Sequence, residues 1–330
     1  MRKAVKKDRL AWLDIMITLL TLELMAYFYY GTRALFTALL CMTVSAAAEF
    51  ISLRIMHRRF TADDLTCVSD GLILALMLPA FIDYEIVVIA AVFMIVVAKC
   101  IFGGRRNMIF SPAAVGYIFI LTSWGKELLT YPAPHDRCGI FSKPDTLVDS
   151  ASHIFNLSGK LNYSDFELLL GNFSGPCGSV SVLLLVVAAV ILILRRDISA
   201  GAFIGSISGT AILAYLSPVS DIRVDSVRYS LIMNMVLFAS IYIISDRRIV
   251  PRRNYYAFFY GFFTAVFAYI IVLTTAKENA VVIVSVLFTP IALSLRTLER
   301  SIEHIRRKDE KAREEKALAA DDTEVSADEQ

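Results

Sequence analysis

Long apolar stretches alternate with short polar ones along most of this chain, and one polar stretch is far longer than the others. It covers residues 124–178 and contains four prolines and two acidic clusters. The apolar sequence on each side of it divides into about five segments of membrane or half-membrane length. The pattern therefore predicts about ten transmembrane helices. Their expected ranges are 13–30, 34–53, 69–82, 85–102, 109–124, 179–194, 198–217, 227–244, 255–275 and 279–296.

Two of the predicted helices are short or interrupted. The third ends at Pro79, and the sixth starts from the Gly- and Pro-rich residues 175–181. With five helices in each half, the two halves would be inverted in the bilayer, an arrangement that places a binding site near the midplane between broken helices. The sequence therefore predicts an all-α polytopic membrane protein made of two inverted five-helix repeats with broken half-helices. The expected divisions are residues 1–124 (first half), 125–178 (extracytoplasmic loop), 179–297 (second half) and 298–330 (charged cytoplasmic tail).

Composition supports this class. Hydrophobic residues make up 57% of the chain and charged residues 19%, so a soluble domain could not bury the apolar surface. The lipid bilayer is the expected environment, and nucleic acid is not an expected partner. The five cysteines show no C-x-x-C spacing, so this chain alone is not expected to build a metal or iron–sulfur site. Cys138 and Cys177 share the long loop and would either pair in an oxidising compartment or remain thiols.

The charges between the apolar segments predict an orientation. Basic residues follow the second, fourth, sixth and eighth segments, whereas the alternate connections are acidic or mixed. The positive-inside rule therefore places both termini in the cytoplasm and the long loop outside. The basic residues used are Arg54, Arg58, Arg59, Lys99, Arg105, Arg106, Arg195, Arg196, Arg247, Arg248, Arg252 and Arg253.

Glu23, Glu49, Asp14 and Lys99 are ionisable residues that fall inside the predicted helices. Glu23 and Glu49 lie deep enough that their charge would be costly in lipid, which makes them candidates for an ion path. Asp14 and Lys99 lie nearer the helix ends, where their side chains are expected to reach the membrane surface.

The end of the long polar stretch carries the most specific string in the chain. Residues 168–181 read LLLGNFSGPCGSVS, in which Gly171, Asn172, Gly175 and Gly178 precede small hydroxyl residues. Glycines let a backbone approach a flat or anionic ligand closely, and a helix N-terminus favours negative charge. A glycine-rich start of a helix without any ligand is the alternative interpretation.

This string resembles the loop-to-helix motif of one family. The family comprises the D subunit of the Rnf-type ion-translocating ferredoxin:NAD oxidoreductase and the B subunit of the sodium-translocating NADH:quinone oxidoreductase. Other segments resemble it in the same order: residues 9–20, 70–79, 99–104 with 107–117, and 245–246 with 260–261. The chain departs from the family pattern at Arg105, Arg106, Met108, Ser111, Ser179 and Arg247. It is therefore identified as a divergent member.

The resemblance implies a membrane subunit of an ion-translocating redox complex in a bacterial cell membrane. Electrons would pass through bound flavin, coupled to movement of Na+ or H+. The other membrane and cytoplasmic subunits of an Rnf-like complex would supply nicotinamide and cluster chemistry, because this chain has no G-x-G-x-x-G unit and no P-loop. By itself the chain is not expected to be a complete enzyme, and no catalytic residue or metal ligand is assigned. Glu49 matches a glutamate of the family, whereas Glu23 does not.

The family carries FMN joined through its phosphate to a threonine in an external D-x-x-[ST]-G-A-T string. Ser152, which follows Ala151, occupies the place of that threonine, and a serine can form the same phosphoester. Asp145 lies one residue too far upstream of it. A degenerated site in a polar loop is the alternative.

A second flavin, riboflavin or FMN bound without a covalent bond, is also implied by the resemblance. Its ring would require aromatic and apolar walls with a few polar groups. The candidates from the motifs are Asn107, Ser111, Asn172, Gly175 and Asp246. Each could instead serve as a helix cap or a tight turn.

Two rival functions use the same fold. One is a flavin-free channel or transporter for a small solute, and the other is a scaffold that anchors an extracytoplasmic electron path. A flavin absorbance band at about 450 nm, a property of any oxidised flavin, would separate the redox function from the channel.

Overall fold

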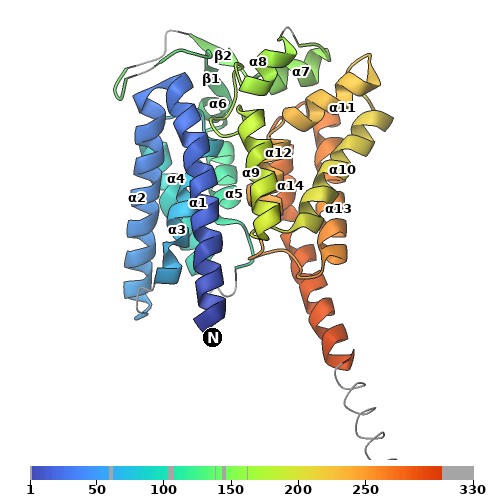
Figure 1. Ribbon diagram of the computed structural model, residues 1–330. Coiled ribbons are helices and arrows are strands. Elements are labelled where there is room, and N and C mark those ends of the chain that lie inside the picture. Colours follow the sequence, from blue (N-terminus) through green and yellow to red (C-terminus); the bar gives the residue numbers. More distant parts are fainter. Residues whose placement is uncertain are drawn as a thin grey trace, which may run out of the picture.

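The structure is a computed structural model that describes residues 2–58, 62–102, 108–137, 139–142, 146–161 and 163–306. It is a bundle of helices with small helices and a two-stranded ribbon at one end (Figure 1). We call that end the loop side. The opposite end, where two helices finish with Arg54 and Arg195 in their last turns, is called the basic side. The first helix begins and the last described helix ends on the basic side (Figure 1).

The first half of the bundle precedes the loop side in sequence. Its elements are α1 (Arg2–Tyr30), α2 (Thr32–Ile55), the 3-10 turn η1 (Ala62–Leu65), α3 (Thr66–Met77), α4 (Tyr84–Phe93), the π-helix η2 (Met94–Cys100) and α5 (Pro112–Ser123). The loop side contains α6 (Gly125–Leu128), β1 (Thr130–Pro132), β2 (Leu147–Asp149), α7 (Ala151–Ser158) and α8 (Asp165–Leu170). The two strands pair antiparallel, with Tyr131 opposite Val148.

The second half follows the loop side. Its elements are α9 (Val182–Arg195), α10 (Ala200–Leu216), α11 (Arg223–Ile232), α12 (Val236–Ala239), the π-helix η4 (Ser240–Ile244), α13 (Asn254–Thr275) and α14 (Ala280–Leu287), followed by a helix at Thr289–Arg306. The predicted tail helix is therefore present as far as residue 306, and the rest of the tail lies outside the described residues.

Three of the described helices are long and apolar enough to cross a membrane: Ala11–Tyr30, Thr32–Ile55 and Asn254–Thr275. The number rises to five when two bent helix pairs each count as one span: Arg223–Ile232 with Val236–Ile244, and Ala280–Leu287 with Thr289–Arg306. The shorter apolar helices α3, α5, α9 and α10 have 12 to 17 residues, fewer than the roughly 20 of a full crossing. The prediction of an all-α polytopic membrane protein is confirmed.

The break after α3 is completed by the second half of the chain. α3 ends at Met77, two residues before Pro79, so its last carbonyl groups have no partner within the helix. The backbone N–H of Gly178 donates to the Leu76 carbonyl at 2.7 Å, and that of Cys177 donates to the Leu78 carbonyl at 3.3 Å. Irregular backbone is tolerated at membrane depth only where such bonds are made.

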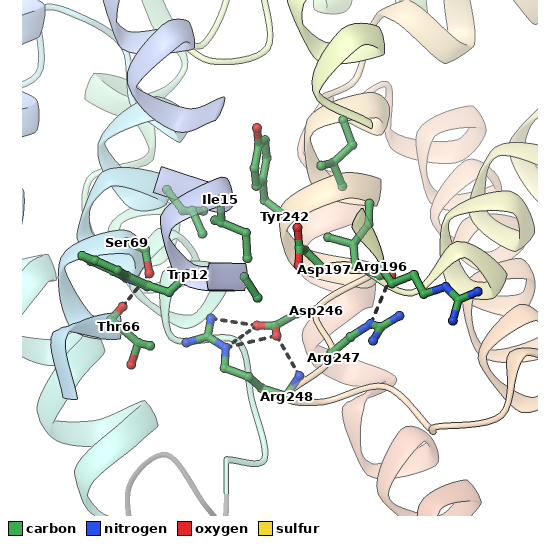
Figure 2. A pocket seen from close by; sticks show the side chains of 14 residues that line it. Trp12, Ile15, Thr66, Ser69, Arg196, Asp197, Tyr242, Asp246, Arg247 and Arg248 are labelled. Atoms are coloured by element: carbon green, nitrogen blue, oxygen red, sulfur yellow. Dashed lines mark hydrogen bonds and ion pairs between the residues drawn. The ribbon is translucent and has the colours of Figure 1, made fainter. Parts of the chain in front are cut away.

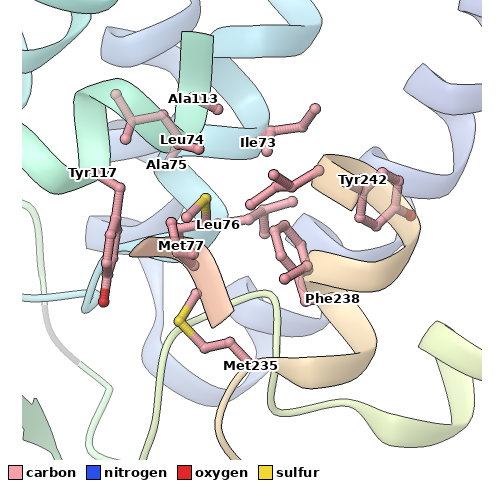
Figure 3. Packing of buried hydrophobic residues seen from close by; sticks show 14 of the residues in the cluster. Ile73, Leu74, Ala75, Leu76, Met77, Ala113, Tyr117, Met235, Phe238 and Tyr242 are labelled. Carbon is pink, nitrogen blue, oxygen red and sulfur yellow. The ribbon is translucent and has the colours of Figure 1, made fainter. Parts of the chain in front are cut away.

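Apolar packing closes the same junction. Figure 3 shows Leu76 and Met77 of α3 beside Met235 and Phe238 of the second half, all of them buried. A Cβ on Gly178 would lie 2.7 Å from both the Leu76 and Phe238 side chains, so only glycine fits there without a shift. The two halves therefore meet at the inner ends of broken helices.

A second break separates α11 from α12, which meet at a bend of 56°. Asn234 and Met235 adopt positive φ angles of 58° and 56° at this bend. The backbone N–H of Asn234 donates to the hydroxyl oxygen of Ser152 at 3.1 Å, and the side-chain amides of Asn234 and Asn156 pair with each other. Thus α7 of the loop side covers the break and satisfies its polar groups.

Helices α10 and α13 pack through small residues. Cβ atoms on Gly205 and Gly261 would lie 2.3 Å and 2.2 Å from backbone oxygens of the facing helix. Such close contact between backbones is typical of helix pairs in membranes. It makes this pair a rigid part of the second half.

Candidate functional site

A cavity with mixed polar and apolar walls lies on the basic side, between the two halves. Its volume is about 280 Å³, just below the range for small-molecule pockets of roughly 300–1,000 Å³. Figure 2 shows aromatic, hydroxyl and charged side chains around it, drawn from α1, α3, η4 and the turns after α9 and η4. The lining residues used below are Trp12, Thr66, Asp197, Tyr242, Asp246 and Arg248.

One arginine joins the two halves at this cavity. The Arg248 guanidinium lies 2.6 Å from an oxygen of Asp70 on α3 and 2.7 Å from an oxygen of Asp246. Figure 2 shows the Arg248–Asp246 contact at the cavity wall. Asp70 is fully buried, so its charge depends on this arginine for compensation. The predicted site residue Asp246 is therefore at the cavity, held in an ion pair.

Asp14 differs from its prediction. Its side chain does not reach the membrane surface but is buried and pairs with Arg195 at the end of α9. Asp197 lies close by, and burial raises the pKa of its carboxyl group, with the charge of Asp14 raising it further. The prediction failed because the partner comes from the other half of the chain, which spacing along one helix cannot reveal.

Three buried polar atoms at the cavity have no hydrogen-bond partner among the described residues. They are the indole N–H nitrogen of Trp12, the hydroxyl of Tyr242, which lies near the Thr18 hydroxyl, and one carboxylate oxygen of Asp197, whose carboxyl group lies near Asp14. Buried polar groups without partners are rare in folded proteins, and they commonly mark the place of a bound ligand or water. The cavity thus offers two donors, one acceptor and two aromatic rings to a bound molecule.

Lys99 also differs from its prediction. Its side chain is fully buried in η2 instead of reaching the surface, and its ammonium nitrogen lies 3.0 Å from a carboxylate oxygen of Glu49. The hydroxyl of Thr66, a residue that lines the cavity, lies 3.4 Å from the same nitrogen. Glu49 is therefore a charge-compensated residue next to the cavity rather than a free carboxylate.

Glu23 contrasts with Glu49. It is 4% exposed in the last third of α1. One carboxylate oxygen of Glu23, like one of Glu49, has no hydrogen-bond partner among the described residues. Glu23 forms no ion pair with a described lysine or arginine. The two predicted ion-path residues therefore lie in different electrostatic settings.

Comparison with known sequences identifies the family. The sequence profile of the NQR2, RnfD, RnfE family matches residues 2–297, nearly the whole chain. The chain belongs to this family. The resemblance found in the motifs is confirmed, and it extends through every described helix up to Leu287.

Curated members of the NQR2, RnfD, RnfE family share modest identity with the chain. Each is named as the D subunit of an ion-translocating oxidoreductase complex. The one from Shewanella sediminis is 27% identical over 43% of this chain and 40% of its own length. Those from Citrobacter koseri and Actinobacillus pleuropneumoniae are 30% and 29% identical, over 38% and 47% of this chain and 36% and 44% of their own lengths. The matched regions thus span less than half of each relative.

The glycine-rich family string has a structural role in this chain. Gly171 has a φ of +96° and ends α8, and Gly178 makes the junction with α3. Gly175 has room for a Cβ, with its nearest neighbour at 3.6 Å. Asn172 is half-buried and its backbone N–H donates to the Glu167 carbonyl. The geometry therefore explains the glycines at 171 and 178, whereas the predicted ligand role of Asn172 and Gly175 stays a prediction.

Two other motif residues lie near α5. Ser111 is buried at the N-terminal end of α5, where its carbonyl accepts from Val115. Asn107 lies outside the described residues. Of the four predicted flavin residues that the structure describes, Asp246 lines the cavity.

Ser152 does not fit a phosphoester in this arrangement. Its side chain is 6% exposed, in the first turn of α7, and its oxygen accepts the hydrogen bond from Asn234 at the α11–α12 break. The sulfur of Met233 lies 3.7 Å from the same oxygen. A phosphate on this atom would displace both contacts. Covalent attachment at Ser152 thus stays a prediction, and it requires α7 to move.

Proposed function

We propose that the chain is the membrane subunit of an ion-translocating redox complex, working with other subunits. The observation that carries this proposal is the family match over nearly the whole chain, supported by relatives named as the D subunit of such a complex. The broken helices that meet between the two halves also suit a protein that moves a small ion. Electron transfer would be coupled to movement of Na+ or H+.

We further propose that the basic-side cavity binds a flavin without a covalent bond. Trp12 and Tyr242 supply aromatic surface, and their unpaired donors would bind acceptor atoms of the flavin ring. The Arg248 ion pairs fix the opposite wall. When bound, the flavin supplies the capacity to accept and release electrons; the protein supplies position, polarity and exclusion of water.

Flavin content tests this proposal. The complex would be purified in detergent. The amount of flavin per chain would be measured from the absorbance band of oxidised flavin at about 450 nm. Trp12→Leu should lower flavin retention about fivefold, because stacking on an aromatic ring is worth ~1 kcal/mol. Trp124→Leu is the matched control, since the chain has two tryptophans and Trp124 lies at the other end of the bundle.

The outcomes separate the rival functions. A folded, colourless native preparation would remove the flavin from the proposal and favour the solute channel. Equal flavin loss in both tryptophan variants would show that the cavity is not the site. Retention in Trp124→Leu alone supports the cavity.

We propose that the basic side faces the cytoplasm of a bacterial cell and the loop side faces outward. The positive-inside rule supports this, because Arg54, Arg195 and the Arg252–Arg253 pair all lie on the basic side. A cysteine in place of exposed Lys160 should react with a membrane-impermeant reagent in whole cells. Protection of that cysteine, with labelling only after lysis, would reverse the orientation.

We place Glu23, rather than Glu49, on the ion path. Glu23 makes no ion pair with a described lysine or arginine, whereas Glu49 pairs with Lys99 at 3.0 Å. Glu23→Gln should therefore reduce ion uptake into vesicles that contain the complex while leaving flavin content intact. Unchanged uptake in that variant would remove Glu23 from the path.

A further inference from the structure

A buried carboxylate lies on the loop side, in the turn between α13 and α14. Glu278 is 3% exposed. The hydroxyl of Tyr131 on β1 donates to one of its oxygens at 2.6 Å, and the hydroxyl of Ser150 donates to the other. Ser150 also caps the N-terminus of α7 by accepting from the His153 N–H. Three separate segments thus converge on one carboxylate.

The charge of Glu278 has no fixed partner in the described part of the chain. No described lysine or arginine pairs with it; its neighbours are the two hydroxyls, His153 and the like-charged Asp149. Both carboxylate oxygens accept hydrogen bonds, which is the pattern of the ionised form. Burial nevertheless raises the pKa of Glu278, because it penalises the charge. An ionised Glu278 therefore requires a cation.

A second group of buried polar atoms adjoins the carboxylate. The Tyr117 hydroxyl on α5 lies against the Asn279 side chain. Apart from this contact, neither the two amide atoms of Asn279 nor that hydroxyl has a hydrogen-bond partner among the described residues. Both residues are fully buried, and the Tyr117 hydroxyl lies beside Glu278 and Asn279. Figure 3 shows that hydroxyl pointing away from the apolar cluster. Unsatisfied oxygens next to an uncompensated carboxylate point to a bound ligand.

We propose that Glu278, Asn279, Ser150, Tyr131 and Tyr117 form a binding site for a monovalent alkali cation, Na+ in particular. The available ligands are oxygens, which hard cations prefer. One carboxylate with neutral oxygens balances a single positive charge. The hydroxyls of Ser150 and Tyr131 donate hydrogen bonds to Glu278, which leaves lone pairs on the hydroxyl oxygens for the cation.

The site deepens the proposed function, since it gives a translocated ion a position on the loop side. Only the role of the site in ion translocation rests on the proposed function; the binding of a cation does not. Cation binding can be measured without any electron transfer, so the site can fail while the redox function stands. The reverse outcome is equally distinguishable.

The experiment is thermal unfolding of the detergent-purified full chain at rising NaCl concentration, with choline chloride keeping the ionic strength constant. A cation that binds only the folded state raises the melting temperature with concentration. We expect this rise for the native chain. Glu278→Gln should abolish it. The matched control is Glu167→Gln, which neutralises an exposed carboxylate on the same side and should retain it.

Two milder variants guard against a folding defect in Glu278→Gln. Asn279→Leu removes amide atoms whose described contact is with the Tyr117 hydroxyl, and Tyr117→Phe removes that hydroxyl. Both should fold, yet the NaCl concentration for the half-maximal rise should increase roughly tenfold or more in Asn279→Leu, as for loss of a group that supports a bound metal. Tyr117→Phe should show a smaller shift in the same direction.

Three results would overturn the proposal. The first is a native melting temperature that does not respond to NaCl. The second is an equal response in the native chain, Asn279→Leu and Tyr117→Phe. The third is a response to pH alone, abolished by Glu278→Gln, which would make Glu278 a proton site without a bound cation. Equal effects of KCl and NaCl would retain the cation site and remove its preference for Na+.

Discussion

The two ends of the bundle handle buried carboxylates in opposite ways. On the basic side, Asp70 and Asp246 share the guanidinium of Arg248 at 2.6 to 2.7 Å. On the loop side, Glu278 has two hydroxyl donors and no described lysine or arginine. An arginine is a permanent part of the protein and always charged. Hydroxyl donors do not neutralise the carboxylate charge, so a cation can bind to it and dissociate again.

Each cluster is therefore suited to a different task. The basic-side ion pairs connect α3 of the first half to the turn after η4, and they are suited to fixing a cavity wall. The loop-side carboxylate is suited to exchange, because no lysine or arginine of the described chain competes for its charge. Variants at each end can break this contrast, and their expected effects differ in size.

The largest effect is expected when the basic-side cation is removed. Arg248→Met leaves Asp70 and Asp246 as two neighbouring carboxylates without compensation. Removing one partner of a buried ion pair typically costs about 3–5 kcal/mol. The melting temperature of the purified chain should therefore fall strongly, measured by thermal unfolding in detergent.

A surface ion pair provides the control for this effect. Lys160 and Asp221 lie 4.0 Å apart with side chains 78% and 88% exposed, so Lys160→Met should leave the melting temperature unchanged. If Arg248→Met melts at the same temperature as the native chain, the ion pairs of Arg248 do not stabilise the basic side and the contrast between the two ends is lost.

A smaller effect is expected at the hydroxyl-bonded loop side. Ser152→Ala leaves the buried N–H of Asn234 without its acceptor, which costs about 1–3 kcal/mol. Ser158→Ala, at an exposed position of the same helix, should cost less. The same pair of variants tests the sequence-based flavin site on denaturing gels viewed under ultraviolet light. Because the native Ser152 oxygen is buried, a fluorescent band abolished by Ser152→Ala would show that α7 opens for attachment, and a dark band for the native chain would remove the covalent site.

The smallest effect is a pH dependence without Na+. The folded-state pKa of Glu278 is raised, so its contribution to stability is fully present below the unfolded value of about 4.3 and is lost as the pH rises through the folded pKa. Melting temperatures should fall across that range in choline chloride, and NaCl should reduce the fall. His153, Asp149, Tyr131 and Tyr117 face the same group, so the difference between the native chain and Glu278→Gln isolates it. A difference curve that is flat with pH would contradict the raised pKa.

The membrane class and the approximate positions of the helices are predictable from the sequence, because soluble folds rarely contain so many apolar stretches of membrane length. Pro79 also marks the break after α3, since proline cannot continue a helix at that point. The second break, at Asn234 and Met235, is not predictable in the same way, because neither residue is a glycine or a proline.

The candidate sites are harder to predict. In the sequence, Arg248 contributes to the charge pattern that sets orientation, and Lys99 is expected at the surface. Their roles depend on Asp70 and Glu49, which lie far away in sequence. Glu278 belongs to the short connection between α13 and α14, whose charges are mixed because Lys277 precedes it. Its position directly before Asn279, at the start of the apolar α14, is the available signal.

The hydrogen bond from Gly178 to Leu76 has a consequence for how the protein is made. The carbonyl groups at the end of α3 receive their donors from residues synthesised about a hundred positions later. In a chain made from its N-terminus, these carbonyl groups therefore lack the Gly178 and Cys177 donors until the start of α9 has been made. Expressed as two separate fragments, each half would carry unsatisfied backbone into the lipid, so assembly becomes a task of the whole chain rather than of its repeats.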